Sequence, residues 1–293
     1  MSEDKKPFPP VVLVVFAVLL WSTGGMFIKL ATNFDAYQVT FFRSLLAAIT
    51  VLLITRRNGL RINGFGIIAS LIYAILLFLF VWATKHTTAA NAIFLQYTAP
   101  IYILILAPFV IGEKFHLRDL ATVVFCIAGM SLFFVGDLTI GDYQGNIAAL
   151  GSGIFLGLYI MLLKHPRVVG MNSVITVIYG NFLLALLTLP SGIAAFPTAT
   201  IRDYAAVAFL GIFQIGISYI LFIKGVTGGT RPLDASIIGF IEPLLNPVWV
   251  FLFVGERPSN WALLGGAIII ATVVVHTLIQ YRIKPATLPT SAP

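Results

Sequence analysis

Long apolar runs separated by short polar segments make up almost all of this 293-residue chain. The hydrocarbon core of a bilayer is about 30 Å thick, so a helix needs roughly 20 apolar residues to cross it. Runs of that length predict an all-α integral membrane protein with ten transmembrane helices. The expected helices cover residues 11–31, 37–55, 64–83, 89–111, 117–135, 145–163, 172–190, 203–223, 232–254 and 259–281.

The segments between these runs are short and rich in turn-forming residues. Examples are "RRNGLRING" at 56–64 and "GDLTIGDYQGN" at 136–146, whose Gly, Asn and Asp residues are typical of turns. None is long enough to form a soluble domain. We expect a polar cytoplasmic lead at 1–10 and a disordered cytoplasmic tail at 282–293.

Composition supports a lipid environment and excludes a soluble globular chain. Charged residues make up 10% of the sequence and hydrophobic ones 59%, with a mean hydropathy of +1.00, whereas soluble domains carry about 25% charged residues. The net charge of +7 is not accompanied by a solvated basic stripe, so no nucleic-acid partner is expected.

The positive charge is instead a topology signal, because cytoplasmic loops of membrane proteins are rich in Lys and Arg. With the N-terminus inside, thirteen of the 18 basic residues fall on the inner side and three on the outer side, while Lys29 and Arg43 lie within helices. Both termini are therefore predicted to be cytoplasmic. The inner residues are Lys5, Lys6, Arg56, Arg57, Arg61, Lys114, Arg118, Lys164, Arg167, Lys224, Arg231, Arg282 and Lys284; the outer ones are Lys85, Arg202 and Arg257.

The chain also contains an internal repeat. When Pro100 is aligned with Pro243, Glu113 aligns with Glu256, and both spans end as Gly-Glu-basic. The second and seventh runs agree as well, "FRSLLAA" against "GNFLLAL". The repeated unit is five helices, at 11–136 and 145–281. An odd number of spans inverts the second copy, and inverted repeats around a central cavity are a plan of secondary transporters.

These features resemble the EamA-type transporters of the drug/metabolite transporter superfamily. The resemblance rests on two five-helix halves, the tryptophan-containing first helix "LLWSTGGMFIKL", the Pro-to-Gly-Glu-basic endings, and the glycine-bearing last helices "CIAGMSLFF" and "LLGGAIII". Within the superfamily the chain is most similar to bacterial amino-acid exporters of the YddG type. The resemblance implies a basket of helices around a cavity, working by alternating access at the inner membrane.

Glu242 is the acidic residue deep inside a predicted span, and a charge at that depth costs about 2.5–3.5 kcal/mol or more, so it should face a cavity or a partner. Asn246 and Trp249 share its helical face. This polar stripe has no counterpart in the first half. The alternative is a structural carboxylate that bonds backbone groups freed by Pro243 and Pro247.

Arg43 and Gln214 are two further candidates for the cavity. The Gln214 amide could bind a polar ligand group or join two helices. Arg43 lies well inside the second helix, with the polar Asn181 as its repeat partner. Together with Glu242 it would provide a cationic and an anionic group suited to a zwitterion such as an amino acid.

Other polar and aromatic residues in the spans could line the same cavity and suit an amphipathic or aromatic side chain. Packing or an interfacial belt is the usual role of Tyr and Trp in membranes, and remains the alternative for each aromatic. These candidates are Gln96, Tyr97, Tyr73, Tyr179, Asn181 and Trp21.

Glu113 and Glu256 are predicted to be structural, because a carboxylate before a helix N-terminus is favoured by free N–H groups. Pro100 and Pro243 belong to the same helix-end frame. No catalytic motif, metal site or cofactor site is indicated.

The sequence therefore predicts an exporter of small amphipathic metabolites, in particular amino acids, and leaves the oligomeric state open. The alternatives are an uptake or exchange transporter, or a membrane enzyme or scaffold.

Overall fold

The computed structural model describes residues 8–56, 60–132, 135, 143–169, 171–254 and 260–283, and in these ranges every regular element is a helix. The helices are α1 (Pro10–Trp21), α2 (Gly24–Leu30), α3 (Ala36–Thr55), α4 (Gly64–His86), α5 (Ala89–Gln96), α6 (Ala99–Val110), α7 (Leu117–Leu132), α8 (Tyr143–Leu162), α9 (Pro166–Val169), α10 (Ile175–Leu187), α11 (Leu189–Ala194), α12 (Ile201–Phe209), the π-helix η2 (Leu210–Ile217), α13 (Ser218–Thr227), α14 (Pro232–Ile238), α15 (Ile241–Val254) and α16 (Asn260–Ile283).

Seven helical stretches in this described part are long and apolar enough to cross a membrane. They are Pro10–Leu30, Ala36–Thr55, Gly64–His86, Asn91–Val110, Tyr143–Leu162, Ile201–Thr227 and Leu263–Gln280. Each falls in one of the ten windows expected from the sequence. The other three windows hold shorter helices, namely α7, α10 and the pair α14 and α15. The all-helical membrane fold is therefore confirmed, while the count of ten spans stays a prediction.

Local chemistry explains where several of these helices begin. Asp35 caps α3 by accepting from the Gln38 N–H, and the Gln38 side chain accepts from the Asp35 N–H in return. Asn63 caps α4 through the Gly66 N–H. Each cap satisfies backbone donors that the first turn of a helix leaves free.

Two of the expected spans are broken just before the aligned prolines. The chain turns at Tyr97 and Thr98 between α5 and α6, so Pro100 lies in the first turn of α6. It turns again at Gly239 and Phe240 between α14 and α15, shortly before Pro243. Proline has no N–H to donate and its ring clashes with the preceding turn, which ends a helix at this point.

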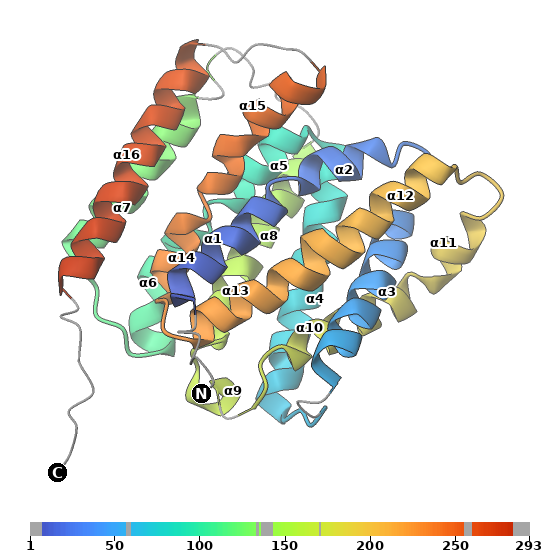
Figure 1. Cartoon of the computed structure of the whole chain (residues 1–293), viewed down its shortest axis with the longest axis horizontal. Coiled ribbons are helices and arrows are strands. Elements are labelled where there is room, and N and C mark those ends of the chain that lie inside the picture. Colours follow the sequence, from blue (N-terminus) through green and yellow to red (C-terminus); the bar gives the residue numbers. More distant parts are fainter. Residues whose placement is uncertain are drawn as a thin grey trace, which may run out of the picture.

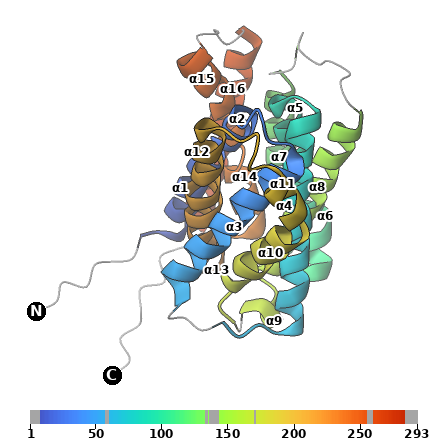
Figure 2. The ribbon, with the colours of Figure 1, turned by 90° about the vertical axis from the view of Figure 1, so that its right-hand side faces the viewer.

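The helices pack as a bundle in which elements distant in sequence lie side by side (Figure 1). α1 packs on α13, α4 packs on α8, and α10 lies between α3 and α4 in both ribbon views (Figures 1 and 2). α7 and α16 form a pair at the edge of the bundle. A Cβ atom on Gly129 of α7 would lie 3.0 Å from the Gly265 carbonyl of α16, so glycine lets these two helices approach closely.

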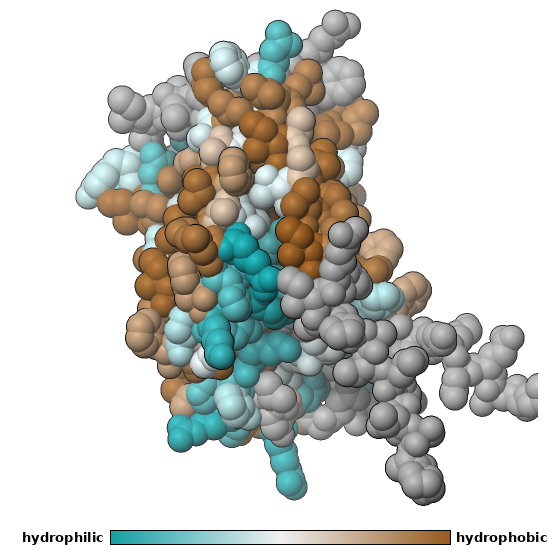
Figure 3. Space-filling view, turned by 90° about the vertical axis from the view of Figure 1, so that its left-hand side faces the viewer, coloured by the Kyte–Doolittle hydropathy of each residue, from teal (hydrophilic) through white to brown (hydrophobic). Residues whose placement is uncertain are grey.

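The outer surface is apolar, as contact with lipid requires. Phe109 is 84% exposed and Ile201 is 90% exposed. On the face that includes the α7–α16 edge, hydrophobic side chains cover much of the upper part and hydrophilic ones gather lower down (Figure 3).

Candidate functional site

A narrow cavity lies in the middle of the bundle, between α1, α3, α4, α8, α13, α15 and the break that separates α5 from α6. Its volume is about 30 Å³, whereas sites for small molecules usually hold about 300–1,000 Å³. In this structure the cavity is therefore too small to hold such a ligand. The lining residues are Trp21, Arg43, Leu76, Leu77, Phe80, Gln96, Tyr97, Leu156, Gln214, Ile215, Tyr219 and Glu242.

The two helix breaks meet at this cavity through one hydrogen bond. Tyr97, at the break before α6, donates its hydroxyl to Glu242 Oε2 at 2.7 Å. Glu242 lies in the first turn of α15 and is 4% exposed. Free N–H groups at a helix N-terminus favour a carboxylate there. The proline-induced breaks thus place a carboxylate and a phenol in the interior.

Arg43 of α3 lines the same cavity and is 0% exposed. Its Nη2 donates to the Leu77 carbonyl at 3.2 Å, while Nε and Nη1 have no hydrogen-bond partner. The Gln214 Oε1 atom is also buried without a partner. Buried polar groups normally have partners, and each exception calls for an explanation. A polar ligand in the cavity would provide hydrogen-bond partners for Arg43 and for Gln214.

The sequence pattern missed Tyr219, which lines the cavity beside Gln214. The preceding helical segment, η2, is a π-helix, whose hydrogen bonds join residues five apart, so α-helical spacing does not predict its faces. Tyr219 packs against Trp21 and Tyr73 with ring centroids 4.8 Å away in each case. An aromatic wall therefore borders the two charged groups.

Three other expected residues are held by protein partners. Trp21 Nε1 donates to Ser218 Oγ at 2.8 Å, and Gln96 Nε2 donates to Ser152 Oγ at 2.7 Å. Both side chains line the cavity, but these nitrogen atoms already donate hydrogen bonds to protein atoms. Asn181 is buried next to Tyr73, and its Nδ2 donates to the Tyr73 hydroxyl at 3.0 Å. Neither Asn181 nor Tyr73 is among the residues that line the cavity.

Tyr179 and Trp249 are not among the residues that line this cavity. Tyr179 is 41% exposed and its hydroxyl donates to the Leu60 carbonyl at 3.2 Å, so it lies at the surface. Trp249 shares a helix with Glu242, but its Nε1 donates to Ser22 Oγ at 3.0 Å, at the end of α1. It is not among the lining residues. The side chain of Asn246 and all of Glu256 lie outside the described residues.

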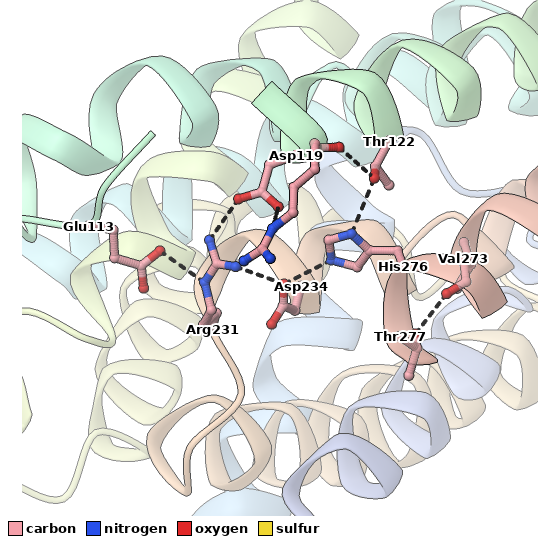
Figure 4. A network of polar contacts seen from close by, with 9 residues as sticks. Glu113, Asp119, Thr122, Arg231, Asp234, Val273, His276 and Thr277 are labelled. Carbon is pink, nitrogen blue, oxygen red and sulfur yellow. Dashed lines mark hydrogen bonds and ion pairs between the residues drawn. The ribbon is translucent and has the colours of Figure 1, made fainter. Parts of the chain in front are cut away.

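A second polar group, the Arg231 cluster, joins the connection before α14 to α7 and α16 (Figure 4). Arg231 Nη2 lies 3.0 Å from Asp119 Oδ2, and Asp119 is 1% exposed. The other two carboxylates, Glu113 and Asp234, each approach the guanidinium at 3.6 Å. His276 Nε2 lies 2.9 Å from Asp234 Oδ1. One arginine thus connects elements of both halves of the chain.

The role expected for Glu113 changes in this cluster. Gly112 has a φ of +69°, which glycine adopts without strain, and the turn points Glu113 toward Arg231 rather than leaving it to cap the next helix. Burial raises the pKa of Glu113, and the Arg231 charge opposes that rise. Burial lowers the pKa of Arg231, but Asp234, Asp119 and Glu113 outweigh it, so the pKa of Arg231 is raised.

Two lysines clamp helix ends at a separate place in the bundle. Lys29 of α2 donates to the Thr87 carbonyl after α4 at 2.9 Å, and Lys85 of α4 donates to the Ala31 carbonyl after α2 at 2.6 Å. Each cation therefore lies at the C-terminus of the other's helix, where the dipole favours it.

The sequence profile of the EamA-like transporter family matches residues 8–135 and again residues 143–278. The chain belongs to this family. It is a multi-pass membrane transporter, and the family is not one of enzymes.

Several characterised and uncharacterised transporters are similar over most or part of the chain. An uncharacterised transporter from Archaeoglobus fulgidus is 25% identical over 92% of this chain and 98% of its own length. A "probable terminal-alkyne amino-acid exporter" from Streptantibioticus cattleyicolor is 24% identical over 66% of each chain. The pseudopaline exporter CntI of Pseudomonas aeruginosa is 20% identical over 90% of this chain and 94% of its own.

A protein of known crystal structure has the same fold, with a TM-score of 0.77. The alignment covers 94% of this chain and 99% of that one at 19% identity.

Proposed function

We propose that this EamA-family transporter exports small amphipathic metabolites, amino acids and aromatic amino acids among them, across a bacterial inner membrane by alternating access. The observation that carries the proposal is the pairing of Arg43 and Glu242 in one cavity. They have opposite charges and are both buried, and within the described part of the chain no ion pair joins them.

A zwitterion matches these two groups. The free Nε and Nη1 donors of Arg43 suit a carboxylate, which guanidinium binds through charge-assisted hydrogen bonds. The Glu242 carboxylate suits an ammonium group, and Gln214 Oε1 offers a second acceptor. The apolar and aromatic lining, including Tyr219, suits an apolar or aromatic substrate side chain.

Two exporters among the relatives support the direction and the substrate class. One is named an amino-acid exporter and the other a pseudopaline exporter. Both relatives have low sequence identity to this chain. The main support for the substrate class therefore comes from the residues of this chain's own cavity.

The packing supports two inverted halves. A pseudo-two-fold axis requires every contact between halves to have a counterpart. α1 packs on α13 as α8 packs on α4, and α3 packs on η2 as α10 packs on α4. Matching the family profile twice agrees with the same division at about residue 140. The asymmetry of Lys and Arg supports cytoplasmic termini.

Alternating access also supplies a reason for the small cavity. A volume of about 30 Å³ cannot hold an amino acid, so helices must separate for substrate to enter. Helices broken near the middle of the membrane are common at transporter binding sites. The breaks before α6 and α15 are the places where the bundle can bend.

Counterflow in proteoliposomes tests the proposal. Vesicles with purified protein are loaded with unlabelled L-phenylalanine, L-leucine or L-threonine and given the labelled amino acid outside. We expect the labelled amino acid to accumulate transiently inside the vesicles. An excess of the same unlabelled amino acid outside should inhibit this accumulation strongly. Phenethylamine, which lacks the carboxylate, and phenylpropionate, which lacks the ammonium group, should inhibit it weakly. Arg43→Gln should raise the KM for the amino acid, because the amide lacks the guanidinium charge.

Tyr179→Phe is the matched control, since Tyr179 lies at the surface, and it should transport as the unchanged protein does. If no labelled amino acid accumulated, or if Arg43→Gln left the KM unaltered, the proposed substrate class would be wrong.

A further inference from the structure

A groove with a volume of about 420 Å³ lies between α7 and α16, on the outer side of this helix pair. The close approach at Gly129 lies toward the other end of the pair. Four residues of α7, beginning with Arg118, and five of α16, ending with Ile279, line the groove. Phe125 and Val275 on its walls are 59% and 54% exposed. The groove therefore opens on the apolar face that meets lipid (Figure 3).

The polar side chains in its walls are bonded within the protein. Thr122 and Thr272 each donate their hydroxyl to a carbonyl of their own helix, at 2.9 and 2.7 Å. His276 Nδ1 lies 3.2 Å from Thr122 Oγ1, and His276 Nε2 lies 2.9 Å from Asp234 Oδ1. The surface that these residues leave to the groove is therefore mostly apolar, which suits a hydrocarbon chain.

Arg118 places a positive charge at one end of this apolar groove. Its side chain is 37% exposed, and its Nε has no hydrogen-bond partner within the described ranges. The nearest carboxylate oxygen, Asp119 Oδ1, is 3.8 Å from Nε, whereas Asp119 Oδ2 is held by Arg231 at 3.0 Å. Lys114, in the turn before α7, is exposed as well. The charge of Arg118 is therefore available to an anion outside the bundle.

We propose that this groove binds an anionic phospholipid of the inner leaflet, with one acyl chain between α7 and α16 and the phosphate on Arg118. The groove extends along α16 from Ala271 to Ile279, which is about 12 Å at 1.5 Å per residue. One leaflet of the hydrocarbon core is about 15 Å thick, so the groove follows an acyl chain through most of it.

The headgroup end fits the same lipid. Guanidinium binds phosphate oxygens through paired, charge-assisted hydrogen bonds. Basic pockets between helices on the cytoplasmic side of a membrane bind anionic headgroups, and the Lys and Arg asymmetry predicts that Arg118 lies on that side. The positive charges of Arg118 and Lys114 also disfavour a headgroup that carries its own cation.

A lipid in this groove would stabilise the helix pair beside the Arg231 cluster. Arg118 precedes Asp119 of that cluster, and His276 belongs both to the groove wall and to the cluster. A ligand that binds the folded protein and not the unfolded one raises its stability. Phosphatidylglycerol should therefore raise the melting temperature of the purified protein in neutral detergent, and phosphatidylcholine should raise it less.

Binding is measured directly by native mass spectrometry of the whole protein in detergent, titrated with phosphatidylglycerol. We expect one lipid to bind more tightly than the others. Arg118→Gln should weaken that binding about tenfold, the loss expected for a charge-assisted hydrogen bond. Ala271→Leu should weaken it too, because the larger side chain fills the groove. Ala271 is exposed, so this second variant should not disturb the packing of the bundle.

Arg167→Gln is the matched control. Arg167 is an exposed arginine that the charge asymmetry predicts on the same side of the membrane, and it lies outside the groove. This variant should bind phosphatidylglycerol as the unchanged protein does. Equal binding by Arg118→Gln or by Ala271→Leu would overturn the proposal. Glycerol phosphate, which has no acyl chain, should give no rise in melting temperature; an equal rise would indicate an anion site and not a lipid site. None of these measurements requires transport, so their outcome is independent of the proposed function.

Discussion

At the residue scale, the hydrogen bond between Tyr97 and Glu242 depends on a glycine. A Cβ atom on Gly239 would lie 2.7 Å from Tyr97 Cε1, closer than two such atoms can approach. We predict that Gly239→Ala displaces the Tyr97 ring, weakens its bond to Glu242 and lowers the transport rate of the protein in counterflow.

Gly64→Ala is a matched control for that substitution. Gly64 is the first residue of α4, and a Cβ there meets nothing within 4 Å. Alanine is also a better helix former than glycine, so transport should be retained. Equal transport by the two variants would show that the position of Tyr97 is not important.

Residue types in the spans predicted six of the seven lining residues that carry a polar group, and missed Tyr219. Glu242, Arg43 and Gln214 were predicted because charge and amide groups are costly in lipid and must face a cavity or a partner. Tyr179 was expected in the cavity but lies at the surface, because an aromatic residue in a span suits both places. Which it faces depends on how its helix is rotated, and neighbouring helices decide that.

At the scale of elements, the Arg231 cluster ties α7 and α16 to the start of α14 (Figure 4). Replacing Arg231 with methionine keeps an unbranched apolar stem but leaves Asp119 buried without its cation. Leaving a buried carboxylate without its cation costs about 3–5 kcal/mol. We therefore predict a lower melting temperature for Arg231→Met in detergent, measured by intrinsic fluorescence.

The pH dependence of the same measurement follows from Glu113. Its pKa in the folded protein is raised above 4.5, so its contribution to stability is complete below that value and is lost as pH rises through the folded pKa. Glu113→Gln has no such proton to lose, and its melting temperature should fall less over this range. A steeper fall in Glu113→Gln than in the unchanged protein would contradict the assignment.

Helix breaks were foreseeable at this scale and helix contacts were not. Proline cannot continue the backbone ladder, so Pro100 and Pro243 mark places where a helix can break. Nothing in the local sequence indicates that Glu113 contacts Arg231, since the two lie far apart in the chain. The π-helix η2 was equally hidden, because its sequence, LGIFQIGI, is compatible with an ordinary apolar helix.

At the scale of the whole molecule, we predict that the alternating access proposed above separates the Arg231 cluster during transport. Cysteines at Glu113 and Arg231, in a background with Cys126→Ala that removes the chain's single cysteine, allow a short thiol crosslinker to hold it closed. We predict that crosslinking abolishes counterflow, and that a cleavable crosslinker restores it on reduction.

The chain with Glu113→Cys alone controls for the chemical modification and should keep its counterflow after the same treatment. Undiminished transport by the crosslinked double variant would mean that this end of the bundle does not open.

The sequence by itself determined that this chain crosses the membrane as helices and which charges could be functional. These properties follow from the free-energy cost of leaving charges and backbone groups without hydrogen-bond partners in lipid. Each segment avoids that cost for its backbone by forming a helix, whose hydrogen bonds lie within the segment itself. The tertiary structure decided that Tyr97 bonds Glu242, that Arg43 keeps two donors free, that Tyr219 faces them, and that Arg231 joins the two halves. Such contacts depend on the rotation and packing of helices from distant parts of the chain, which no local pattern specifies.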